Sequence, residues 1–137
     1  MADEWELVEG TPVTRDFTVS SSVAVEKGTA MTLTDPRTAT ANTTSGSLFA
    51  GVAMTEKSIT DGDTSTELGL AVWGGVWKVS ASGAIAVGEP VGMSGTGNRV
   101  TEVAGGRQGL RVVGYALEAI AENTSGEIVL APGAGGS

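Results

Sequence analysis

The chain repeats part of its own sequence, and this repeat restricts the folds that are open to it. Three blocks recur in the same order, at offsets of 60, 63 and 60 residues. In the last block five of eight positions are identical. Two copies are too few for a solenoid, which needs about three repeats. We therefore predict two similar halves around one pseudo-symmetric core. The matched blocks are residues 24–31 with 84–91, 50–54 with 113–117, and 64–71 with 124–131.

The residue pattern within each half is that of β-strands. Apolar and polar side chains alternate over residues 30–34 and 67–72, as in half-buried strands. Residues 111–117 are apolar nearly throughout, which predicts a strand covered on both faces, and residues 127–130 form a short last strand. Residues 116–122 have helical propensity, but seven residues favour a strand end and a turn. We predict an all-β fold, either a small β-barrel or a β-sandwich of β-tulip type.

The composition divides the chain into three segments. We expect an extended N-terminal arm over residues 1–20, because this stretch is acidic at its start and has too few apolar residues for a core. A β domain follows over residues 21–132, with its halves at about 21–73 and 81–132. The Gly-rich residues 133–137 are expected to be a flexible tail.

Two internal connections are harder to assign. The apolar residues of this region occupy even-numbered positions before Gly74 and Gly75 and odd-numbered positions after them. This change in parity indicates either a β-bulge in a continuous strand or a two-residue hairpin turn. We favour the bulge. Trp73 and Trp77 bracket this glycine pair, and the simplest interpretation is that both fill the core. The polar residues 35–46 are expected to form an exposed loop.

The residues needed for catalysis are scarce. The chain has no histidine and no cysteine, which excludes the commonest general base and every thiol nucleophile. Its net charge of −8 argues against a nucleic-acid partner, since phosphates demand the opposite sign. The remaining candidates are expected to be turns or solvated faces, so we predict no enzyme, no cofactor and no metal site. These candidates are Asp61 and Asp63, the Gly-rich residues 92–97, Glu118 and Glu122, and the arginines Arg99, Arg107 and Arg111.

The chain also has no membrane signature. No apolar run approaches the roughly 20 residues that cross a bilayer. The acidic N-terminus lacks the basic and apolar regions of a signal peptide. We therefore expect no membrane partner and an intracellular site of synthesis.

Four segments together resemble one protein family. Residues 70–79 end in Gly-Val-Trp-Lys-Val, and residues 82–91 contain Gly-Ala-Ile and then Gly-Glu-Pro-Val. Residues 113–119 are Val-Gly-Tyr-Ala-Leu-Glu-Ala, and residues 126–130 are expected to form a short apolar strand. This series resembles the small head-decoration, or capsid cement, proteins of tailed phages. The resemblance covers about residues 45–131. The sequence departs from this family in the acidic arm, in the Thr-rich residues 35–46 and in the Gly-rich tail.

The resemblance implies a structural role on a virus particle. It implies a protein that binds the outer surface of an icosahedral head, is made in the host cytoplasm and stabilises the shell. The implied partners are the major capsid protein and copies of the chain itself, as a homotrimer at local three-fold positions. The alternative is a sugar- or receptor-binding β module of a viral fibre or surface protein, which side-by-side exposure of Trp73 and Trp77 would favour. A small β-clip enzyme is a third hypothesis, but it lacks residues to line a polar pocket.

The arm carries the candidate contact residues. Trp5 lies among carboxylates, and it can either anchor in a partner or fold back onto its own domain. Residues 16–19 are expected to join a partner by strand addition. The residues predicted to contact the capsid or a neighbouring copy are Trp5, Leu7, Val8, Phe17 and Val19.

Overall fold

The computed structural model describes residues 3–41, 48–58, 66–95, 97–103 and 111–133. The described part of the chain is all-β, as predicted, and its strands fall into two groups. The strands are β1 (Glu6–Glu9), β2 (Val13–Thr18), β3 (Ala30–Asp35), β4 (Thr38–Ala41), β5 (Phe49–Ala53), β6 (Glu67–Trp73), β7 (Val76–Ser80), β8 (Pro90–Met93), β9 (Val100–Glu102), β10 (Gly114–Ala116) and β11 (Ser125–Leu130).

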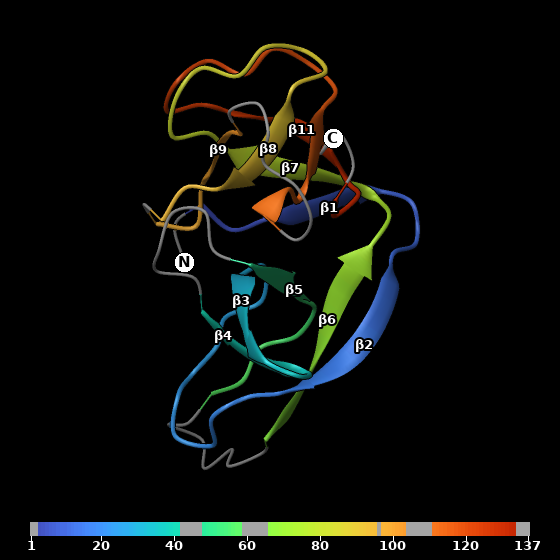
Figure 1. Cartoon of the computed structure of the whole chain (residues 1–137), viewed down its shortest axis with the longest axis vertical. Coiled ribbons are helices and arrows are strands. Elements are labelled where there is room, and N and C mark those ends of the chain that lie inside the picture. The colour runs from blue at the N-terminus through green and yellow to red at the C-terminus, as the bar shows by residue number, and fades with distance from the viewer. Residues whose placement is uncertain (1–2, 42–47, 59–65, 96, 104–110, 134–137) are drawn as a thin grey trace.

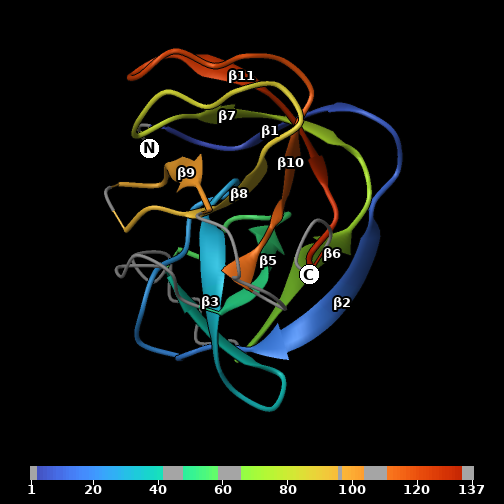
Figure 2. The same ribbon diagram turned by 45° about the horizontal axis from the view of Figure 1, so that its top comes forward.

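The two groups of strands form two stacked units. Strands β2-β4-β3-β5-β6 close into a barrel, which we call the first half. Strands β7 to β11 form the second half, in a sheet of order β1-β7-β11-β10-β8-β9 to which β1 adds an edge strand. Figure 1 shows the second half above the first. In Figure 2, β1 lies beside β7 in the second half, and β2 lies beside β6 at the outer side of the first half.

The second half repeats the topology of the first. The order β7-β11-β10-β8-β9 matches the order β2-β6-β5-β3-β4, strand for strand. Each half also has one parallel pairing, Thr18 with Thr38 and Ala81 with Val100. The two similar halves predicted from the repeat are confirmed, with repeated strands over residues 13–73 and 76–130. The single core predicted for them is wrong, because their side chains form two core clusters.

One pair of matched blocks is shifted in the structure. Val52 pairs with Ala71 and Tyr115 pairs with Val129. In these pairings each residue of β10 lies 63 positions after its equivalent in β5, as in the sequence repeat. Each residue of β11 lies 58 positions after its equivalent in β6, whereas the sequence repeat has an offset of 60. Because the shift is an even number of residues, the same sides of the strands still face inward.

The part of the first half that faces the second half is buried on both faces of its sheet, whereas β2 is largely exposed. Side chains inside its barrel form one core, and side chains on its outer face join the core of the second half. Met31 and Leu70 point into the barrel, whereas their neighbours Ala30 and Ala71 contact the second half. All five residues of β5 are buried for this reason. Each fully buried aliphatic side chain stabilises the fold by about 1.5–3 kcal/mol.

The glycine pair links the two halves, and the predicted bulge is wrong. Strand β6 ends at Trp73 and pairs with β2 and β5, whereas β7 pairs with β1 and β11. Gly74 and Gly75 have φ angles of 93° and 87°, a left-handed conformation that favours glycine. The change in parity therefore marks a change of sheet, which leaves Trp73 51% exposed and Trp77 2% exposed.

Two other local predictions need correction. The polar stretch expected as a loop contains β4, because Ala39 is buried and its strand pairs with β3. The end of that stretch, residues 42–46, lies outside the described residues. The strand expected over residues 111–117 is shorter, although Val112 and Val113 before it are buried. The chain turns after Ala116 and is not helical there, as expected.

Candidate functional site

The N-terminal segment, residues 3–12, lies at the junction between the two halves. Trp5 is 2% exposed and stacks on Phe49, with ring centroids 6.0 Å apart and planes inclined by 17°. Its backbone N–H donates to the carbonyl of Gly28 at 3.0 Å, and its indole N–H donates to the carbonyl of Asn98 at 3.0 Å. Of the two alternatives that the sequence left open, the structure shows Trp5 folded onto its own domain.

Asn98 joins three parts of the chain through one side chain. It precedes β9 in the second half and is almost completely buried. Its amide nitrogen donates to the carbonyls of Gly28 at 2.6 Å and Asp3 at 3.1 Å. Its amide oxygen accepts from the N–H of Ala30 at 2.8 Å. Because every one of these partners is a backbone group, the bonds fix the path of the N-terminal segment across both halves.

A partly exposed ion pair holds the start of this segment. The guanidinium of Arg99 donates from Nε to Asp3 Oδ2 at 3.0 Å and from Nη1 to Asn123 Oδ1 at 2.6 Å. Such a pair is worth at most about 1 kcal/mol near solvent. Arg99 is thus engaged with its own chain, and Arg107, which was expected on the same face, lies outside the described residues.

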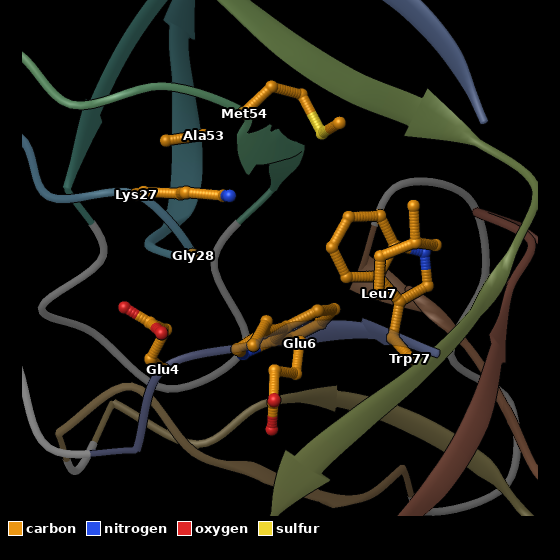
Figure 3. Close-up of a pocket in the computed structure, with 9 residues that line it drawn as sticks. Glu4, Glu6, Leu7, Lys27, Gly28, Ala53, Met54 and Trp77 are labelled. Atoms are coloured by element: carbon orange, nitrogen blue, oxygen red, sulfur yellow. The ribbon is translucent and has the colours of Figure 1, made fainter. Parts of the chain in front are cut away.

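A cavity of about 400 Å³ opens beside the N-terminal segment. Figure 3 shows the ammonium group of Lys27 extending into it, with Leu7, Met54 and Trp77 on its apolar side. Within the described ranges, no group of three or more acidic side chains is placed to hold a metal ion. The Asp61 and Asp63 pair lies outside those ranges. The lining residues are Glu4, Trp5, Glu6, Leu7, Lys27, Gly28, Ala53, Met54 and Trp77.

The five predicted contact residues are not gathered on one surface. Trp5 and Val19 are buried, and Phe17 packs half-buried against the core of the first half. Leu7 and Val8, in the edge strand β1, are exposed. The strand addition predicted for residues 16–19 takes place within the chain, since β2 pairs with β6 and β4.

Sequence reasoning did not find Asn98. A single asparagine beside a Gly-rich turn has no local signature that separates a buried linker from an ordinary turn residue. Its role depends on Gly28 and Asp3, which are 70 and 95 positions away. Only the assembled fold brings these groups together.

Two equivalent glycines test how tightly the N-terminal segment is seated. Gly28 and Gly88 have φ angles of 85° and 80°, so alanine is equally strained at both. A Cβ on Gly28 would lie 2.8 Å from the carbonyl oxygen of Trp5, whereas a Cβ on Gly88 would meet nothing within 4 Å. We expect Gly88→Ala to cost about 1 kcal/mol and Gly28→Ala about 1–3 kcal/mol more, measured by urea unfolding. Equal losses would contradict the seating described above.

The comparisons with known proteins agree with this architecture. The described residues form a β protein of two similar halves that share a core. A sequence model of the phage cement protein family matches residues 8–131. The chain belongs to that family, which is a structural family of phages. A search of curated proteins finds no match.

A solved structure shares the fold. The crystal structure of the head fiber gp8.5 N base of bacteriophage phi29 is similar with a TM-score of 0.53 and 17% sequence identity. The alignment covers 88% of this chain and 97% of that one. In the described ranges, no helix is long and apolar enough to cross a membrane.

Proposed function

We propose that this protein binds the outer surface of an icosahedral phage head and stabilises it as a decoration protein. The observation that carries the proposal is the family match, which spans nearly the whole chain. The proposal includes the major capsid protein as partner, synthesis in the host cytoplasm and self-association as a homotrimer at local three-fold positions. It includes no catalytic role.

The edge strand β1 is the part of the predicted contact set that remains available. It stands at one end of the six-stranded sheet, and its only partner among the described strands is β7. An edge strand presents backbone N–H and C=O groups that another chain can pair with. The exposed side chains of Leu7 and Val8 would add apolar contact to such a pairing.

Co-sedimentation with phage heads tests the proposed function. The purified protein would be mixed with decoration-free shells from its own virus, in the compact and the expanded state. We expect saturable binding to the expanded shells, with a stoichiometry that distinguishes trimers from other arrangements. Failure of the wild-type protein to bind either shell would contradict the proposed function.

A point variant tests the contact through β1. Deleting residues 2–15 would remove the buried Trp5, so a loss of binding could reflect unfolding. Val8→Asp instead places a charge on an exposed position and is expected to weaken shell binding about tenfold, which corresponds to about 1.4 kcal/mol. Val23→Asp, at an exposed position of the first half, is the control. Equal affinities for the two variants would remove β1 from the contact.

The observation that would favour a sugar- or receptor-binding module is missing. That hypothesis calls for two tryptophans exposed side by side, as a platform for a ligand. Trp77 is buried and donates its indole N–H to the carbonyl of Gly74 at 3.1 Å. Trp73 alone reaches the surface.

A further inference from the structure

The outer face of the second half carries an exposed apolar surface. Val87, Leu117 and Tyr115 are 66%, 42% and 37% exposed, which is high for large apolar side chains. Tyr115 pairs across the sheet with the half-buried Val129, so these two side chains share a face. Val87 is adjacent because the N–H of the next residue, Gly88, donates to the carbonyl of Ala116. We call Val87, Tyr115, Leu117 and Val129 the β10 patch.

The same face of the first half is covered by the chain itself. The strand pairings make Val52 the equivalent of Tyr115 and Ala71 the equivalent of Val129. Val52 and Ala71 are both completely buried, in the core that they share with the second half. One face of the repeated unit is therefore closed in the first half and open in the second.

The equivalent glycine turns show what kind of group closes this face. Over Gly28, the extended residues Glu4 and Trp5 pass so closely that no Cβ would fit, and the Trp5 N–H donates to the Gly28 carbonyl. Over Gly88, no atom would lie within 4 Å of an added Cβ. The turn at Gly28 is therefore covered by a backbone segment that carries a large apolar side chain, Trp5. The turn at Gly88 has a similar φ angle, but the described part of the chain does not cover it.

The charges around the β10 patch indicate the chemistry of its partner. Glu118 follows Leu117 in the chain, Glu127 lies opposite Leu117 through the hydrogen bond from the Leu117 N–H, and Glu89 follows Gly88. Lys78 lies opposite Glu127 and adds one positive charge. Among the described residues the rim is therefore acidic overall, and it would attract lysine or arginine. At this patch, contact with a second copy of the chain is disfavoured by the same field, since each copy has a net charge of −8. Contacts between copies in the proposed trimer would therefore use another surface.

We propose that the β10 patch receives an extended segment of the phage shell protein that carries an apolar side chain next to lysine or arginine. This inference rests on the proposed function and adds to it the contact face and the chemistry of the partner segment. The segment passes over Gly88 as Glu4 and Trp5 pass over Gly28. Its apolar side chain covers Tyr115 and Leu117, and its cationic group lies near Glu118.

Shell binding by two classes of variant tests this contact. The double variant Val87→Gln/Leu117→Gln makes the patch polar without changing its charge and is expected to weaken binding to decoration-free shells by about a hundredfold, since two apolar contacts are lost. Glu118→Gln keeps an oxygen that can accept from the Glu127 N–H, so the local structure is retained while the charge is removed. It is expected to weaken binding a few-fold and to reduce the salt dependence of binding. Val23→Gln is the matched control, at a valine that is 46% exposed in the first half.

The outcomes separate this inference from the proposed function. If the wild-type protein binds shells and the double variant binds equally well, the β10 patch is not the contact, and the proposed function stands. If the wild-type protein does not bind shells, both fail. A change in the solution mass of the double variant, measured by sedimentation velocity, would assign the patch to contact between copies and overturn the proposal. Unchanged affinity and salt dependence of Glu118→Gln would overturn the cationic part.

Discussion

Replacing Trp5 by alanine is expected to lower the free energy of unfolding by about 3–5 kcal/mol. The side chain is buried in the core that the two halves share, and it stacks on Phe49. Its removal leaves a cavity at the junction and leaves the carbonyl of Asn98 without the indole donor. A loss of this size is a large part of the 5–15 kcal/mol that stabilises a typical domain.

Urea unfolding followed by far-UV circular dichroism measures this effect without relying on tryptophan fluorescence. Trp73→Ala is the control, because Trp73 is the same residue type on the surface at the end of β6. It is expected to change stability by less than about 1 kcal/mol. Similar losses for the two variants would show that the N-terminal segment does not contribute to the core.

The two-half fold could be predicted because its signals are local. The alternation over residues 30–34 and 67–72 needs only neighbouring residues to place a strand and its buried side. The repeat then shows that the same unit occurs twice. The resemblance of residues 70–79 and 113–119 to decoration proteins rests on the same short-range features.

The candidate site could not be predicted in the same way, because long-range pairing decides it. Residues 1–20 look like an arm, since the stretch is acidic at its start and has too few apolar side chains for a core of its own. In the structure β1 pairs with β7 and β2 with β6, and the paired residues are 49 to 72 positions apart in the chain. The burial of Trp5 and the exposure of Leu117 both follow from which half covers which face.

The connections between the halves make the N-terminal segment a structural brace. The chain crosses the junction from β1 to β2 and again from β6 to β7. The two crossings touch at glycines, where a Cβ on Gly10 would lie 3.2 Å from the Cα of Gly75. Together with the hydrogen bonds of Asn98, they oppose separation of the halves.

Gly114→Ala is expected to have an effect as large as that of Trp5→Ala, by adding an atom where the fold has no room for it. A Cβ at this position would overlap the carbonyl oxygen of Val129 and lie 2.9 Å from its carbonyl carbon. Val129 belongs to β11, which is paired on one side with β10 and on the other with β7. The clash cannot be relieved by a side-chain rotation, so the strands must separate. We expect a loss of at least about 3 kcal/mol, at or beyond the upper end of ordinary overpacking.

Gly69→Ala is the matched control for this variant. Gly69 is also a strand glycine, but its added Cβ would lie 3.7 Å from Asp16 Oδ1, an ordinary contact distance. Alanine restricts the unfolded chain by a similar amount at both positions, about 0.4–1 kcal/mol, so this contribution cancels in the comparison. The difference between the urea midpoints of the two variants therefore isolates the packing of β10 against β11. Matching midpoints would mean that the register pairing Gly114 with Leu130 is wrong, and with it the equivalence that defines the β10 patch.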